Sequence, residues 1–364
     1  KQGIRKAATL EEMLKISNYL NKNPVEYLDK ARYVSLQTNA TQMPIGRMEI
    51  ELNEDLGRFM GLLYGDGHID DIKIEFTNIN VELLHEFGML AEKLFGAKGR
   101  IIRPTNRSTN YQISSRTLNY ILKNMFALHT GDKAAVQTIP EVILTSPDSV
   151  VAAFLQGYFD CDSCVYKNSA QIEFCTASKI MAEQIQLCLQ RFGIISFLKP
   201  KMVKETEYYR LFIRGESCVA FQKFIGFRHA DKKARLQKVI QTTFNSNVDV
   251  VPNAWSLVKE SNKKFGVGKK LDQKEYGRKT LQRLSTKIFE KTGSSEDETA
   301  KQIQTLAFSD LFWEKIIEIE KVKPKEEFVY DLTVDETHSF VANGIIAQNT
   351  SMLQAMMQEI PQNL

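Results

Sequence analysis

Two aspartates of this sequence could act together on a phosphate. Asp66 and Asp162 each end a segment with helical spacing, and each segment carries small residues four positions apart that would let two helices pack closely. Packed in parallel, the helices would place two carboxylates side by side at helix C-termini, where like-charge repulsion and the helix dipole disfavour them. Divalent cations would offset both penalties, because Mg²⁺ binds carboxylate and phosphate oxygens. We therefore predict a Mg²⁺ site at Asp66 and Asp162 that supports phosphodiester hydrolysis.

An internal duplication places the two aspartates at matching positions. Landmarks recur in the same order at offsets of 96 to 98 residues, which indicates two copies of one structural unit. The small residues are Gly57 and Gly61 in the first helix and Ala153 and Gly157 in the second. The recurring landmarks are Gly61 to Asp66 with Gly157 to Asp162, Ile74-Glu75-Phe76 with Ile172-Glu173-Phe174, Phe95-Gly96 with Phe192-Gly193, and Tyr111 with Tyr209.

The elements that must position these residues follow one order in both copies. Helical spacing and period-2 alternation predict helix, strand, helix, strand, helix, a mixed α/β unit built twice. The predicted helices cover residues 56–64, 81–95 and 117–125 in the first copy and 149–159, 179–192 and 217–225 in the second. The predicted strands cover residues 72–77, 111–115, 170–175 and 208–214.

At the two aspartates, residues 59–67 and 155–163 resemble the paired motifs of the LAGLIDADG homing endonucleases. The resemblance covers roughly residues 50 to 245. It implies a pseudo-twofold pair of αββαββα-like repeats whose strands lie in the DNA major groove, with metal-dependent cleavage of both strands. Ser163 replaces the final glycine of the second motif, and Cys161 stands between its two acids, whereas the acid itself is retained.

The resemblance also implies basic residues near the metals. Lys133, and either Lys232 or Lys233, stand where the family's lysines usually fall, and a cation there would stabilise charge developing on phosphate. An ordinary surface lysine is the alternative at each position. His68 is the one histidine that we place near this site. The single CxxC at residues 161–164 lacks the second pair that a structural zinc site needs, so we assign it no metal.

Outward strand positions and the loops beyond them are predicted to contact double-stranded DNA. Arg, Lys and Gln side chains can read base edges, and the remaining cations would meet phosphate. The sequence leaves open which face of each strand is exposed. The predicted contacts are Lys73, Glu75, Thr77, Arg103, Arg107, Gln112, Ser114, Lys167, Gln171, Glu173, Lys201, Arg210, Phe212 and Arg214.

The C-terminal region carries a second kind of chemistry. Residues 329–350 closely resemble the C-terminal splicing blocks of inteins, which implies an all-β segment of the Hint type. Asn343-Gly344 is a favoured hairpin turn within it. Strands are predicted over residues 316–322, 328–334, 338–342 and 345–347.

The intein resemblance implies a role for individual residues. The side-chain amide of Asn349 would attack its own carbonyl and cut the chain before Thr350, whose hydroxyl would take over the upstream segment as an ester. His338 and Asp331 would assist by proton transfer and hydrogen bonding. Gln348 stands where the family usually has histidine, so assistance to Asn349 would come from elsewhere, with His338 as the candidate.

The N-terminal splicing blocks are absent, since residue 1 is Lys and no TxxH block follows early. We therefore expect the N-terminal intein half and flanking exteins as partners, besides DNA. The expected segments are 1–48, a remnant of the N-terminal splicing half; 49–247, the endonuclease, with repeats at about 49–130 and 131–247; 248–310, a helical linker or accessory DNA-contacting region; 311–349, the splicing segment; and 350–364, the start of the C-extein.

Amino-acid composition restricts the class of protein to which this chain can belong. Lys and Arg number 48 against 44 Asp and Glu, so the net charge of +4 alone does not indicate a nucleic-acid partner. An odd count of 5 cysteines argues against a disulfide framework. No signal-like start or long apolar run occurs, so we expect a cytoplasmic protein without a membrane segment. We also expect it to be a monomer.

Two other functions stay open at this stage. One is a DNA-binding or maturase-like protein that keeps the fold but has lost cleavage, for which Ser163 is the only hint. The other is a splicing element with a decayed endonuclease. Retention of Asp66 and Asp162 counts against the first, and the intact repeat offsets count against the second.

Overall fold

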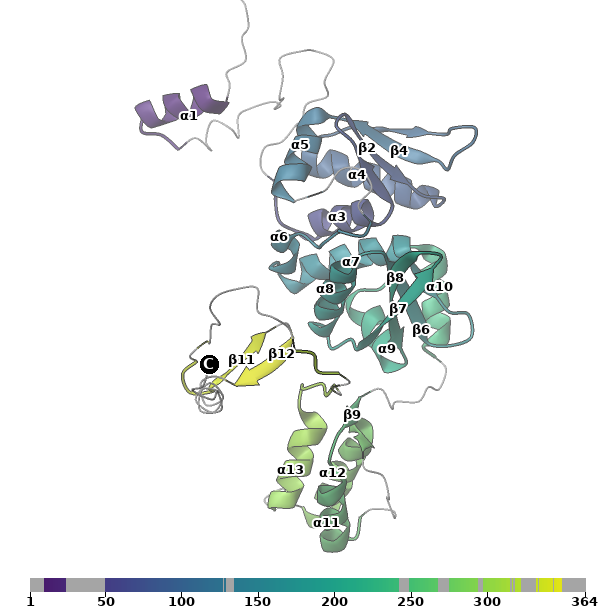
Figure 1. Cartoon of the computed structure of the whole chain (residues 1–364), viewed down its shortest axis with the longest axis vertical. Coiled ribbons are helices and arrows are strands. Elements are labelled where there is room, and N and C mark those ends of the chain that lie inside the picture. The colour runs from purple at the N-terminus through teal and green to yellow at the C-terminus, as the bar shows by residue number, and fades with distance from the viewer. Residues whose placement is uncertain are drawn as a thin grey trace, which may run out of the picture. The chain divides into compact units, whose positions relative to one another are not determined.

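The computed structural model describes residues 10–23, 50–126, 128, 134–241, 249–267, 275–293, 297–314, 316, 318–321, 332, 334–342 and 344–348. The chain divides into two compact units, Lys1–Val248 and Asp249–Leu364 (Figure 1). The first unit holds the helix α1 (Leu10–Tyr19) and both copies of the duplicated unit. The predicted site residues Lys133, Asp331, Asn349 and Thr350 lie outside the described residues, as does the predicted segment 350–364.

Both copies contain a helix, two strands, a helix, two strands and a helix. Their four-stranded sheets have matching strand orders, β1-β2-β4-β3 and β5-β6-β8-β7, with antiparallel neighbours. The mixed α/β fold predicted from the sequence is therefore confirmed. The first copy consists of α3 (Glu54–Asp66), β1 (Gly67–Ile69), β2 (Lys73–Thr77), α4 (Val81–Phe95), β3 (Arg100–Ile102), β4 (Asn110–Ser114) and α5 (Arg116–Met125). The second consists of α6 (Glu141–Leu144), α7 (Asp148–Asp162), β5 (Ser163–Val165), β6 (Gln171–Thr176), α8 (Lys179–Gln190), β7 (Ser196–Val203), β8 (Thr206–Arg214), α9 (Glu216–Phe224) and α10 (Ala230–Val239).

Within the two copies, four of the described strands and two of the described helices were not predicted. Strands β1, β3 and β5 are each 3 residues long, too short to show alternation. Strand β7 lies at a sheet edge and is exposed over most of its length, with Pro200 inside it, so its two faces do not differ in polarity. Helix α6 has only 4 residues, and α10 is largely charged on its exposed side.

Local signals explain where the long helices begin. The Asn53 side chain accepts a hydrogen bond from the Leu56 N–H at the start of α3, and Ser178 accepts one from the Met181 N–H at the start of α8. Such caps satisfy backbone donors that have no partner within the helix. Helix α4 ends at Gly96, whose φ of 64° is the left-handed conformation that glycine adopts without strain.

Helices α3 and α7 form the centre of the first unit and lie side by side (Figure 1). A Cβ added at Gly57, Gly61 or Gly65 would lie less than 3.0 Å from atoms of α7, so none of these positions has room for a side chain. The atoms met belong to Val150, Phe154 and Cys161 in turn, so the two helices run parallel. On α7, backbone atoms of Phe154 and Gly157 are the nearest to Gly61.

The second unit is a small helical domain followed by a hairpin. Its core consists mainly of residues of the helices α11 (Trp255–Phe265), α12 (Arg278–Thr292) and α13 (Glu298–Phe308), with the short strands β9 (Val250–Val251) and β10 (Tyr276–Gly277) paired antiparallel. All three helices lie within residues 248–310, for which a helical region was predicted. The hairpin pairs β11 (Ser339–Ala342) with β12 (Ile345–Gln348).

The predicted strand over residues 316–322 is wrong for the part that the structure describes. Residues 316 and 318–321 carry no strand. A strand packed on a core needs an apolar residue at every second position, and this segment does not keep that pattern. Ile316 and Ile319 are both exposed. The predicted strand at 328–334 falls almost wholly outside the described residues.

Candidate active site

The two predicted acids meet at the C-terminal ends of the parallel helices. Asp66 is the last residue of α3 and Asp162 the last residue of α7. The preceding turns touch, because a Cβ on Gly65 would overlap the side chain of Cys161. Burial and the neighbouring charge of Asp66 raise the pKa of Asp162 to about 7, although Lys232 lowers it. The charge of Asp66 acts on Asp162, so the two carboxylates lie near each other in a partly desolvated place.

The two aspartates have different neighbours. The Asn78 side chain, which follows β2, donates a hydrogen bond from Nδ2 to Oδ2 of Asp66 at 2.6 Å. The register β2 to β4 and β6 to β8 places Thr176 at the matching point of the second copy. Asn78 was not predicted. Its only signal in the sequence is that it is a polar residue directly after a strand that leads to the site.

Lys232 is the lysine of the predicted pair that reaches the acids. From α10 its Nζ donates hydrogen bonds to the carbonyl oxygens of Phe159, Asp160 and Cys161 at 3.0, 2.7 and 3.2 Å. These carbonyls belong to the last turn of α7 and have no partner further along the helix. Burial lowers the pKa of Lys232, and Asp160 opposes that shift. Lys233 points elsewhere on α10 and is exposed.

A buried ion-pair network joins the two copies beside this site. Arg58 of α3 donates to Asp160 at 2.6 Å and to Glu86 of α4 at 2.8 Å. Glu86 also accepts from Arg228 at 2.5 Å. Burial alone would raise the pKa of Glu86, but Arg58 and Arg228 lower it below its usual value. The pairs therefore hold the Glu86 carboxylate in its charged form, and they satisfy the buried Asp160 carboxylate with the Arg58 guanidinium.

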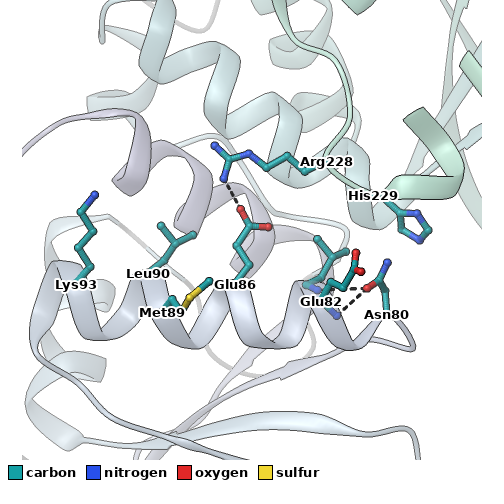
Figure 2. Close-up of a pocket in the computed structure, with 9 residues that line it drawn as sticks. Asn80, Glu82, Glu86, Met89, Leu90, Lys93, Arg228 and His229 are labelled. Carbon is teal, nitrogen blue, oxygen red and sulfur yellow. Dashed lines mark hydrogen bonds and ion pairs between the residues drawn. The ribbon is translucent and has the colours of Figure 1, made fainter. Parts of the chain in front are cut away.

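Asp160 also fixes the approach to α10. Its carboxylate accepts the backbone N–H groups of Arg228 and His229 at 3.2 and 3.1 Å. These N–H groups precede the first turn of α10, so a carboxylate from α7 replaces a local cap. Figure 2 shows Arg228 reaching Glu86 above α4, beside a cavity of about 480 Å³ that neither Asp66 nor Asp162 lines.

The open faces of the two sheets carry the predicted DNA contacts. In the first sheet Lys73 pairs with Ser114, Glu75 with Gln112 and Thr77 with Asn110, on the face opposite buried Ile74, Phe76 and Ile113. In the second sheet Gln171 pairs with Arg214, Glu173 with Phe212 and Cys175 with Arg210, opposite Ile172, Phe174 and Ile213. Lys201 lies exposed on β7, and Arg103, Arg107 and Lys167 lie exposed in loops.

Contacts on these faces refine the prediction. Arg210 pairs with Glu173 at 2.5 Å, and Tyr166 donates to the same carboxylate at 2.6 Å. Phe212 is only 5% exposed, because the guanidinium carbons of Arg210 and Arg214 lie 4.8 and 5.0 Å from its ring centroid. Phe212 therefore supports two arginines, a role that the sequence does not reveal.

Register adds residues to the open faces that the sequence analysis missed. Arg100 pairs with Gln112 across β3 and β4, and Lys199 pairs with Arg210 across β7 and β8. Asn110 faces Thr77 in the first sheet. The strands β3 and β7 were not predicted, so these cations could not be assigned to a sheet face from residue types alone.

At the C-terminal hairpin, the register brings two predicted residues to one end. Ser339 pairs with Gln348, so His338 and Gln348 lie at the open end of the hairpin. His338 has a φ of 50°, uncommon for a residue with a Cβ. The side chain of Gln348 lies outside the described residues.

Residues 149–226 match the family model of a LAGLIDADG-like domain. The matched stretch runs from α7 to the glycine after α9, so it includes Asp162 and the second sheet. Among the described residues no group of three or more His, Cys, Asp and Glu side chains could hold a metal. In the same described part, no helix has the length and hydropathy to cross a membrane.

Several curated proteins are similar to this chain. Elongation factor 2 of Methanopyrus kandleri is 25% identical over 312 residues, covering 84% of this chain and 24% of that protein. The replication factor C small subunit of Thermococcus kodakarensis is 30% identical over 273 residues, covering 74% of this chain and 30% of that protein. The chain thus spans less than a third of the length of these curated relatives.

Solved structures show a distant likeness. Mesophilic variants of the homing endonuclease I-DmoI give a TM-score of 0.40 at 16% identity, covering 51% of this chain and 98% of that chain. I-DmoI in complex with DNA and Mn gives a TM-score of 0.39, covering 48% and 97%. Full-length DUF199/WhiA from Thermatoga maritima gives 0.38 at 12% identity, covering 71% and 91%.

Proposed function

We propose that this chain contains a site-specific endonuclease that hydrolyses both strands of duplex DNA, with Asp66 and Asp162 as its catalytic acids. The parallel packing of α3 and α7 carries the proposal, because it joins two helix-terminal aspartates from two copies of one unit. A duplex offers two phosphodiester strands related by a dyad, so a duplicated acid site matches its symmetry. The match to a LAGLIDADG-like domain supports the same conclusion.

The side chains present fit a hard divalent cation such as Mg²⁺. Mg²⁺ is usually held by one or two carboxylates together with waters and substrate phosphate, so Asp66 and Asp162 supply enough ligands. The pKa of Asp162, raised to about 7 by burial and by the charge of Asp66, is what uncompensated adjacent carboxylates should show. Such cations, when bound, would activate water and stabilise the leaving oxygen.

The chain's own residues position the acids and the substrate. Asn78 orients Asp66 through its hydrogen bond, and Lys232 fixes the last turn of α7, which carries Asp162. Lys232 also places a cation beside the acids, where charge would develop on phosphate. The open sheet faces then provide base and phosphate contacts, with Arg210 and Arg214 held on the Phe212 ring.

We further propose that the endonuclease lies within an intein. Elongation factor 2, a glutamine–fructose-6-phosphate aminotransferase and a replication factor C small subunit differ widely by name, yet this chain aligns with 24%, 27% and 30% of their lengths. A segment shared by such different proteins is not expected to supply the activity of any one of them. This pattern supports an inserted element, with Asn349, Thr350, His338 and Asp331 as its C-terminal splicing residues.

Cleavage of DNA tests the first proposal. If Thr350 begins the host protein, the DNA that encodes residues 350–364 supplies one half of the target. A plasmid library with this half fixed and the other half randomised would be incubated with the chain and Mg²⁺. Double-strand cuts at one sequence, lost in Asp66→Asn and in Asp162→Asn, are expected. Specific binding without cutting by the unsubstituted chain would instead favour a DNA-binding protein that has lost cleavage.

Self-cleavage tests the splicing proposal. Cyclisation of Asn349 should release the peptide 350–364, which mass spectrometry detects. Asn349→Ala should abolish the release, whereas Asn363→Ala, which removes an asparagine beyond the cut, should leave it intact. Equal release from both variants would exclude Asn349 as the cutting residue.

A further inference from the structure

The second unit carries an exposed basic surface on two of its helices. Lys259 and Lys263 lie exposed on α11, opposite the buried Val258. Arg283 and Lys287 lie exposed on α12 in the same i, i+4 relation. The carbonyl oxygen of Phe265 at the end of α11 accepts the Lys291 Nζ of α12 at 2.7 Å, so the two helices are joined at their C-terminal ends.

Acidic residues do not balance this surface. Residues 255–292 contain 11 Lys and Arg against 4 Asp and Glu, a net charge of +7, although the whole chain has only +4. Lys264 pairs with Asp297 and Arg278 with Asp249 in this unit. Lys259, Lys263, Arg283 and Lys287 form no ion pair with any residue that the structure describes. Exposed like charges at this density repel one another unless an anion lies over them.

An aromatic ring lies at the edge of the same surface. Trp255 is 41% exposed at the first position of α11, and the Lys259 Nζ lies 4.8 Å from its ring centroid. A spacer between two domains needs a core, which Leu281, Leu284 and Ile288 help to provide. It does not need an exposed indole with a lysine ammonium over its ring, or four exposed cations that have no carboxylate partner among the described residues.

We propose that this α11–α12 basic surface, formed by Trp255, Lys259, Lys263, Arg283 and Lys287, binds the phosphate backbone of duplex DNA beyond the stretch contacted by the two sheets. The inference rests on the proposed endonuclease function. Residues 242–248 connect this unit to the first one, so DNA held by either unit raises the effective concentration of DNA at the other. Contacts with the DNA backbone raise the affinity and fix the position of the protein on the duplex, but they do not read the base sequence.

The salt dependence of DNA binding tests the proposal. The full chain would bind a fluorescent duplex of about 60 bp and random sequence in EDTA, with Kd measured from low to moderate salt. Each phosphate contact contributes about 0.9 to the slope of log Kd against log salt. Arg283→Gln/Lys287→Gln should therefore lower that slope by about 2. The matched control is Lys93→Gln/Lys179→Gln, which removes two exposed helix cations from the first unit and should leave the slope unchanged.

A second readout follows the indole directly. The chain has 2 tryptophans, so Trp313→Phe leaves Trp255 as the only one. Its emission should be quenched by the same duplex, and Lys259→Gln/Lys263→Gln should weaken that quenching. An unchanged slope in the α12 variant, or unchanged Trp255 emission on saturation with DNA, would overturn the proposal. Neither readout needs cleavage, so a failure of the endonuclease proposal would appear separately as an uncut plasmid library.

Discussion

Arg58 and Asp160, 102 positions apart in the sequence, form a buried ion pair of 2.6 Å between the two copies of the duplicated unit. Asp160 is also the residue that caps α10, and α10 carries Lys232. One carboxylate thus links the packing of the two copies to the lysine beside the acids. Its position, two residues before Asp162, makes it a positioning residue for the proposed site.

Removal of one partner of this pair should be strongly destabilising. Arg58→Met leaves the carboxylate of Asp160 buried without its cation, and breaking such pairs typically costs about 3–5 kcal/mol. The free energy of unfolding, measured with urea, should fall by this amount. The double variant Arg58→Met/Asp160→Leu should recover part of the loss, because it leaves neither charge unpaired. A single variant as stable as the original chain would show that the pair does not hold the copies together.

Gly61 should be intolerant of alanine. In an ordinary helix interior alanine is about 1 kcal/mol better than glycine. Here a Cβ would lie less than 3.0 Å from the Phe154 carbonyl oxygen, so Gly61→Ala should lower the free energy of unfolding by about 1–3 kcal/mol. Ala153→Gly, one residue before Phe154 on α7, removes only a methyl group and should cost the helix propensity of about 1 kcal/mol.

The sequence was informative where alternation was long enough to measure. Ile74 and Phe76 alternate with Lys73 and Glu75, so residue types separated the two faces of β2, and the structure shows which of the two is buried. Three-residue strands such as β1 offer no such pattern. Their presence depends on pairing with a neighbouring strand of the sheet, a tertiary effect.

The residues that contact the turns carrying the two acids could not be predicted from the sequence, for a related reason. Asp66 and Asp162 could be paired because a duplication marks both. The contacts of Lys232 with Phe159 and of Arg58 with Asp160 span 73 and 102 positions and follow no repeat. Lys232 could be separated from Lys233 only when the direction of each on α10 was known.

Stability of the metal-free chain should depend on pH through Asp162. The folded chain binds the Asp162 proton with a pKa of about 7, whereas an ordinary aspartate loses it near 3.8. The folded state therefore holds more protons between these values, and the free energy of unfolding should fall as pH rises from about 4 to about 7. Urea unfolding in EDTA at about pH 5 and about pH 8 measures this difference.

Asp162→Asn should reduce that difference, because asparagine does not titrate. Asp231→Asn, an exposed aspartate on α10, should leave it unchanged. Saturating Mg²⁺ should also flatten the dependence for the unsubstituted chain, since a cation between the acids favours the ionised form. A pH difference that persists in Asp162→Asn would place the responsible group elsewhere.

The two adjacent lysines of α10 provide the sharpest test of the site. Lys232→Met removes a cation that touches three carbonyls of the last turn of α7, so DNA cleavage at saturating substrate should fall by about 10²-fold or more. Lys233→Met removes the same charge from an exposed position one residue away and should leave cleavage within a factor of a few. Lys232→Arg distinguishes charge from geometry: it keeps the cation, but the planar guanidinium cannot meet three converging carbonyls as an ammonium does. Recovery of cleavage in Lys232→Arg would show that charge near the acids is sufficient, whereas continued loss with normal DNA affinity would assign Lys232 to the positioning of Asp162.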